Sequence, residues 1–217
     1  KKWLDNFKAS SPSNSLADYM LAEDFFKNHQ PEAALKELTE ASTKPQFSDY
    51  SMETILDGED LSRFSGSAPM STYVNLMGSV ASDHMPELAS FKSVAVGIRD
   101  MQQPYASAGD AASVQAMAQL GIGLADRIGS GDSGKLVISQ LVSMSAEAIV
   151  LGALDQNTSY DFLGGQTPAQ RLADFKKARA SFQEMNNNAG AAFIALSDEQ
   201  MAGYWERVKI YGEMEAM

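Results

Sequence analysis

The sequence contains no cysteine among its 217 residues. Disulfide bonds, zinc–thiolate sites, iron–sulfur clusters and a thiol nucleophile are therefore excluded. Histidine is almost as scarce, with only His29 and His84 present. Neither has a glutamate or a second histidine at the spacing of metal ligands, which excludes a zinc hydrolase. We interpret both histidines as residues of surface turns.

The sequence also lacks a long apolar run. None reaches the ~18 residues that span a bilayer, and the longest, residues 146–154, is interrupted by Glu147 and Gly152. Because the chain starts at Lys1 and not at methionine, we expect that a segment has been removed, either a signal peptide or an N-terminal anchor that tethered the chain to a membrane. This expectation favours an extracytoplasmic location over a cytoplasmic one. Residues 1–13 are then expected to form a flexible segment or spacer.

Basic residues are the scarcer class of charged residue. The 17 lysines and arginines are outnumbered by 28 aspartates and glutamates, which gives a formal net charge of −11. An acidic surface repels phosphate backbones, so binding to nucleic acid is not expected unless basic residues cluster. The densest basic group consists of Lys176, Lys177 and Arg179, with Arg171 upstream. We interpret this group as one solvated face of a helix.

The sequence is rich in apolar side chains that recur at helical spacing. Hydrophobic residues make up 44% of the chain, enough for a sizeable core, and no segment alternates as a strand would. The sequence therefore predicts an all-α fold, an irregular array of about nine helices packed as antiparallel hairpins. Residues 14–217 are expected to form a single helical domain, with residues 136–154 at its buried centre. One helix is expected to run from Pro168 to about Met185 and to break at the three asparagines of residues 186–188.

Residues typical of helix starts and ends predict several helix boundaries. Pro31 suits the first position of a helix, where its missing N–H costs nothing. Gly109 can adopt the left-handed conformation that closes one helix, and Asp110 can then cap the next. Ser197 and Gln200 have the spacing of a capping box at the start of the final helix.

The first hairpin, residues 14–45, has a distinctive pattern of small and large side chains. The residues of this pattern, which let two antiparallel helices approach closely, are Leu21, Ala22, Phe25, Ala34, Leu38, Ala41 and Pro45. The pattern resembles one tetratricopeptide repeat (TPR). It departs from the repeat at Asp18, where a large residue belongs, and at Pro45, which falls about one residue early. The resemblance implies a TPR-like hairpin and a groove that binds protein segments.

Two shorter segments carry a second resemblance. They are Ala-Gly-Asp-Ala-Ala at residues 108–112 and Ile-Ser-Gln-Leu-Val at residues 138–142. In these segments and in its general pattern the chain is similar to uncharacterised bacterial helical proteins with an N-terminal membrane anchor. That resemblance implies a bacterial, membrane-anchored protein and brings no known activity.

A glycine-rich loop from Gly129 to Lys135 matches the first part of a phosphate-binding loop. Leu136 stands where such a loop needs serine or threonine, and Asp132 would place negative charge inside the phosphate cradle. We therefore interpret the loop as a helix connection and expect no cofactor.

Nothing in the sequence has the arrangement of a catalytic site. No Gly-x-Ser-x-Gly elbow occurs. The pairs of adjacent carboxylates lie near expected surfaces or helix starts: Glu23 with Asp24, Glu59 with Asp60, and Asp198 with Glu199. We therefore expect that the chain is not an enzyme. An enzyme of unrecognised type stays a third hypothesis, which strongly shifted carboxylates buried in a cleft would favour.

The favoured function is a protein-interaction or scaffolding module. In hairpin arrays the binding surface lies on the first helix of a hairpin, which here carries Asp18, Glu23 and Asp24. An acidic groove favours a basic protein or peptide partner. Tyr204 and Trp205 project on different sides of the final helix, which we interpret as docked on the core. The alternative is that one of the two residues is exposed as an anchor for a partner.

The alternative function is the binding of a small ligand in a cavity between helices. A core rich in methionine and phenylalanine can leave such a cavity. A pocket of several hundred Å³, lined by Phe175, Phe182 or Met144, would favour this hypothesis.

Overall fold

The computed structural model describes residues 2–79 and 85–216. Within these ranges the chain forms eleven α-helices and no β-strand, which confirms the predicted all-α class. The helices are α1 (Lys2–Ser10), α2 (Leu16–Lys27), α3 (Pro31–Thr43), α4 (Ser51–Phe64), α5 (Pro69–Ser79), α6 (Met85–Ser107), α7 (Ala111–Ile128), α8 (Val137–Leu151), α9 (Pro168–Ile194), α10 (Asp198–Tyr211) and α11 (Glu213–Ala216). Two 3₁₀ turns, η2 (Ser133–Lys135) and η3 (Asp161–Leu163), lie in the loops after α7 and α8.

Helix boundaries fall where the sequence supplies caps. Pro31 is the first residue of α3. Gly109 has a φ of 74°, and Asp110 accepts the backbone N–H of the third residue of α7. Ser197 and Gln200 form the predicted capping box at the start of α10. These local predictions are confirmed because a cap depends only on residues three positions away.

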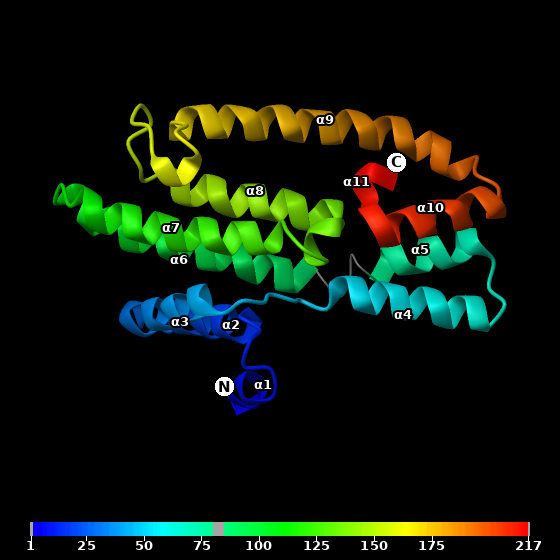
Figure 1. Cartoon of the computed structure of the whole chain (residues 1–217), viewed down its shortest axis with the longest axis horizontal. Coiled ribbons are helices and arrows are strands. Elements are labelled where there is room, and N and C mark those ends of the chain that lie inside the picture. The colour runs from blue at the N-terminus through cyan, green and yellow to red at the C-terminus, as the bar shows by residue number, and fades with distance from the viewer. Residues whose placement is uncertain (1, 80–84, 217) are drawn as a thin grey trace.

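The helices enclose two apolar cores. The larger core lies among α2, α3, α6, α7 and α8, and the smaller one lies among α4, α5, α10 and α11. Figure 1 shows α6, α7 and α8 side by side, with the α2–α3 hairpin on one side of them. On the other side α9 runs along α8 and continues toward α10. The hairpin thus covers one face of the larger core, while α9 connects the two ends of the molecule.

Glycines allow the closest helix contacts in the larger core. A Cβ atom on Gly121 of α7 would collide with the Val150 side chain of α8. A Cβ atom on Gly97 of α6 would likewise collide with the ring of Phe26 on α2. Any larger residue at either position would push the helices apart, which disturbs a close-packed interior.

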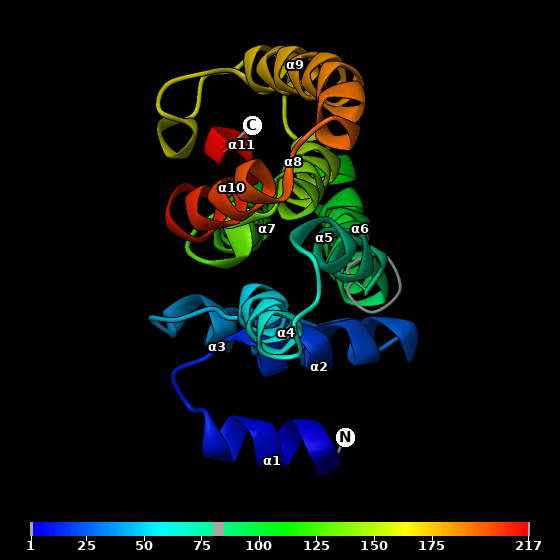
Figure 2. The same cartoon turned by 90° about the vertical axis from the view of Figure 1, so that its right-hand side faces the viewer.

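Residues 1–13, expected to be a flexible spacer, instead contain α1. Figure 2 shows α1 lying below the α2–α3 hairpin, apart from both cores. The turn after α1 is also held in place, because the Asn14 Oδ1 atom accepts the N–H groups of Leu16 at 3.1 Å and Ser48 at 3.2 Å. Within the described ranges, no helix is both long enough and apolar enough to cross a membrane.

The expected break at residues 186–188 is wrong, because α9 continues through them to Ile194. Asparagine costs a helix only about 0.7 kcal/mol per residue relative to alanine, far less than proline. No proline accompanies these asparagines, and Gly190 just beyond them costs a helix only about 1 kcal/mol. Three weak helix formers in a row therefore do not end the helix.

Candidate functional site

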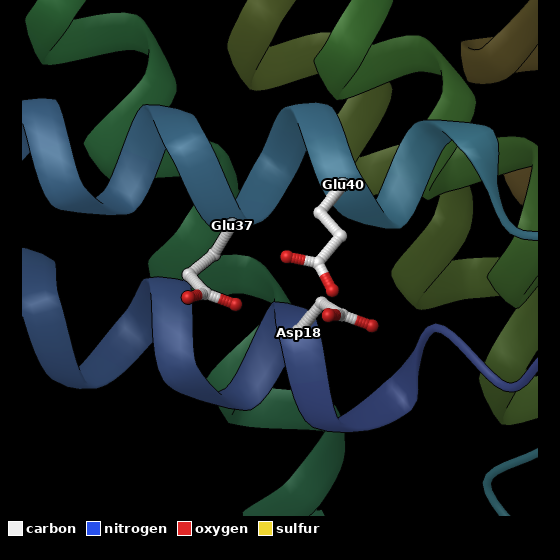
Figure 3. A group of neighbouring side chains, drawn as sticks. All are labelled: Asp18, Glu37 and Glu40. Carbon is white, nitrogen blue, oxygen red and sulfur yellow. The ribbon is translucent and has the colours of Figure 1, made fainter. Parts of the chain in front are cut away.

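Three carboxylates meet on the α2–α3 hairpin, as Figure 3 shows. Asp18 comes from α2, while Glu37 and Glu40 come from α3, and one oxygen of each lies within 4.8 Å of the others. Glu37 and Glu40 share one face of α3 because they are three residues apart. The antiparallel course of α2 places Asp18 opposite them. We call this cluster the acidic pocket.

Asp18 is the buried member of the acidic pocket. Its relative exposure is 0%, and a buried carboxylate needs cationic partners to remain charged. Lys44, just after α3, places its Nζ atom 2.5 Å from Asp18 Oδ2. Lys8 of α1 places its Nζ atom 2.8 Å from Asp18 Oδ1. Each carboxylate oxygen therefore has its own ammonium group.

Lys8 contacts all three carboxylates. Besides Asp18, its Nζ atom lies 2.8 Å from Glu37 Oε2 and 3.1 Å from Glu40 Oε1. Burial opposes the charge on Lys8, but the hydrogen bonds to the three carboxylates outweigh it and raise the pKa of Lys8 above its ordinary value. The lysine therefore stays protonated at neutral pH, with a hydrogen bond to Glu37 Oε2 and ion pairs to Asp18 and Glu40.

Carboxylate oxygens at this spacing could also hold a hard metal cation. Here the ammonium groups of Lys8 and Lys44 lie among the carboxylate oxygens. The pocket contributes three negative charges and Lys44 cancels one of them, so an additional cation is favoured. In this structure the lysine side chains of Lys8 and Lys44 supply the positive charge.

Apart from Lys8, α1 is attached only shallowly. None of its residues is buried. The Phe7 ring meets the Tyr50 ring edge-on, with centroids 6.1 Å apart, and Trp3 stacks on Phe7 at 5.8 Å. Trp3 keeps 68% of its surface exposed. The polar contacts of Lys8 are therefore the specific part of the attachment.

The three acidic residues expected to form a binding surface do not act together. Asp18 lies in the acidic pocket, whereas Glu23 is buried elsewhere on α2 and pairs with Lys27 at 2.7 Å. Asp24 is half-buried and accepts a hydrogen bond from the Asn28 side chain at 3.2 Å. The expectation that these three residues form one acidic groove is therefore corrected.

Sequence reasoning missed the partners Glu37, Glu40, Lys8 and Lys44. One signal was present, because Asp18 departs from the repeat pattern at a position that normally holds a large buried residue. A charged residue at a buried position requires partners of opposite charge nearby. The aspartate at position 18 could therefore have indicated the acidic pocket.

The alternative that Tyr204 or Trp205 is exposed as an anchor is wrong. Their exposures are 3% and 2%. The Tyr73 ring of α5 packs against both rings, with centroids 5.9 Å and 5.8 Å away, and the Phe193 ring of α9 lies 4.9 Å from Tyr204. Neighbouring rings from α5 and α9 therefore bury both residues, which confirms the interpretation that the helix docks on the core.

The glycine-rich loop joins the two cores. Lys135 pairs with Asp132 at 2.9 Å and donates to the Lys209 carbonyl at 2.9 Å. The buried Ser133 hydroxyl donates to Asp49 at 2.8 Å. These contacts confirm that the loop is a helix connection, because its polar groups are engaged within the chain.

The structure describes one of the two histidines. His29 is exposed in the turn between α2 and α3, with a φ of 55°. This position confirms its interpretation as a turn residue. His84 lies outside the described residues.

Other proteins give no further guide to the site. Comparisons with family models, with curated proteins and with solved structures found no match to this chain.

Proposed function

We propose that the chain is a protein-interaction module whose α2–α3 hairpin binds a lysine-bearing amphipathic helix. The observation that supports this proposal most directly is the Lys8 ammonium group, which lies within 3.1 Å of carboxylates from two helices. In this chain α1 fills the role of the bound helix. A partner with the same chemistry would compete with α1 for the acidic pocket.

The manner of attachment is that of a ligand on a surface. Helix recognition commonly combines a few apolar anchors with charges that fix the register. Phe7 supplies the apolar contact and Lys8 the charge, while no residue of α1 enters either core. The resemblance of residues 14–45 to a tetratricopeptide repeat, a hairpin used for such recognition, supports the same proposal.

A labelled peptide of residues 1–12 tests the proposal when it is titrated into the intact chain. The α1 helix of the wild-type chain competes with the peptide, so the Lys8→Ala chain should bind the peptide about tenfold more tightly. Adding Glu37→Gln and Glu40→Gln to that chain should abolish binding. Fluorescence anisotropy of the peptide measures each affinity.

Two controls make the result specific. A peptide in which Lys8 is replaced by glutamine should bind at least about tenfold more weakly, because a neutral side chain cannot pair with the carboxylates. Glu32→Gln, an exposed change on the same helix α3, should leave binding unchanged. The proposal fails if the peptide binds neither chain, or if Glu32→Gln weakens binding as much as the pocket variants.

A further inference from the structure

A pocket of about 340 Å³ lies between α8 and α9. Its lining residues come from one face of each helix, at spacings of three and four: Leu141, Met144, Ser145 and Ala148 from α8, and Leu172, Phe175, Lys176 and Arg179 from α9. Phe175 and Met144 are two of the three residues at which a ligand cavity was expected, while Phe182 is not among the lining residues.

One ion pair holds α9 against α8 beside this pocket. Glu147 of α8 is 3% exposed, and Arg171 of α9 donates to its two oxygens at 2.8 Å and 3.2 Å. The Arg171 guanidinium also lies 5.0 Å from the centre of the Phe175 ring. This bidentate contact fixes both the separation and the rotation of α9. The pocket therefore has rigid walls on both sides.

The floor of the pocket is apolar yet incompletely covered. The side of α8 that carries Val150 and Leu151 is fully buried in the larger core. On the other side, Leu141, Met144 and Ala148 stay partly exposed. Covering such surface gains roughly 25 cal/mol per Å², which favours an apolar ligand.

The rim of the pocket is positively charged. Lys176 and Arg179 line it, and neither forms an ion pair with another residue in the described part of the chain. The neighbouring Lys177 differs, because it pairs with Asp174 at 3.8 Å and does not line the pocket. In a chain with a net charge of −11, two cations without acidic partners beside an apolar pocket favour an anionic ligand.

We propose that this pocket binds a medium-chain carboxylate, with its alkyl chain against Leu141, Met144 and Phe175 and its carboxylate between Lys176 and Arg179. The lining residues of α8 run from Leu141 to Ala148, about 10 Å at the 1.5 Å rise per residue of an α-helix. That length corresponds to a carboxylate of about eight to ten carbons. The site is separate from the acidic pocket of the α2–α3 hairpin.

Isothermal titration of decanoate into the intact chain, below the micelle concentration, tests this proposal. Saturable binding to one site is expected. The double variant Lys176→Gln/Arg179→Gln should weaken binding about tenfold or more, because charge-assisted hydrogen bonds to the carboxylate are lost. Ala148→Phe should also weaken binding, since the larger side chain fills the pocket while the rim charges stay in place.

Matched controls distinguish binding in the pocket from a general attraction between the anionic ligand and positive charges on the surface. Lys177→Gln removes the same charge from the same helix and should leave the affinity within about twofold. Decanol should bind at least about tenfold more weakly than decanoate, because it lacks the carboxylate. Circular dichroism confirms that each variant remains helical. The proposal is overturned if decanoate shows no saturable binding, if decanol binds equally well, if Lys177→Gln matches the double variant, or if the pocket is instead covered by a second copy of the chain.

Discussion

The Arg127 side chain of α7 donates a hydrogen bond to the Ser15 hydroxyl, 2.7 Å away and 112 positions earlier in the chain. Its other terminal nitrogen donates to the carbonyl of Ser42 at 3.0 Å and to that of Lys44 at 2.8 Å. One guanidinium group therefore contacts the start of α2 and the end of α3 together. This contact fixes the hairpin, and with it the acidic pocket, to the larger core.

Arg127→Met is expected to lower the free energy of unfolding by about 2 kcal/mol. The change removes three hydrogen bonds from a charged donor, each worth roughly 1.5–3 kcal/mol when fully buried and less at a partly exposed site. Urea denaturation followed by circular dichroism measures the effect. Arg99→Met serves as the control, because among the described residues Arg99 pairs only with its exposed neighbour Asp100, and it should change stability by less than about 0.5 kcal/mol. Equal effects of the two substitutions would contradict the role assigned to Arg127.

Long-range contacts such as those of Arg127 could not be predicted from the sequence, whereas local features could. The hairpin of residues 14–45 and the caps at Asp110 and Ser197 were predictable because each depends on residues a few positions apart. The partners of Arg127 lie more than 80 positions away. No local pattern indicates which distant carbonyls a guanidinium will meet.

The acidic pocket shows the same limit. The sequence marked Asp18 as acidic and as a departure from the repeat pattern, yet placed it in a binding groove. Its partner Lys8 lies on α1, which was expected to be a flexible segment or spacer because residues 1–13 end in a serine-rich stretch. The sequence also left open whether Tyr204 or Trp205 is exposed, since the distant rings that cover them, Tyr73 and Phe193, come from helices α5 and α9.

Asp18→Asn should destabilise the fold by about 3 kcal/mol. The change keeps the shape of the side chain but leaves Lys44, which is largely buried, without its closest anionic partner, and breaking a buried ion pair typically costs 3–5 kcal/mol. Lys8→Ala should have a smaller effect, because α1 buries no residue. Urea denaturation compares both variants with Asp57→Asn, an exposed control. If Lys8→Ala proved as destabilising as Asp18→Asn, α1 would be part of the core and not a docked helix.

Glu147→Gln should loosen α9 more than the rest of the fold. Glu147 is 3% exposed and binds Arg171 through both oxygens, so its loss leaves a guanidinium facing a neutral group at a cost of about 2–4 kcal/mol. Amide hydrogen exchange should accelerate in α9 before it does in α7. The control is Asp174→Asn, which removes an exposed carboxylate from α9 itself. The prediction fails if exchange in α9 is unchanged by Glu147→Gln, or equally faster in both variants.

Glu213 makes stability depend on pH in a direction that can be checked. Burial raises the pKa of Glu213 above its ordinary value of 4.5, although the hydrogen bond from the Val137 backbone N–H opposes this shift. Between the unfolded and the folded pKa values the native state binds more protons than the unfolded state, so this group reduces stability as pH rises through that window. Glu213→Gln can keep accepting the Val137 N–H and carries no charge.

The free energy of unfolding of Glu213→Gln should therefore match that of the wild type below pH 4.5. Its excess over the wild-type value should grow as pH rises toward the folded pKa of Glu213, and then stay constant at higher pH. Guanidinium denaturation across this pH range measures the difference, in which the titrations shared by both proteins cancel. Glu215→Gln, exposed on the same short helix, should show no such rise. A difference that stays flat with pH, or that falls as pH rises, would mean that the Glu213 carboxylate is as well solvated in the folded chain as in the unfolded one.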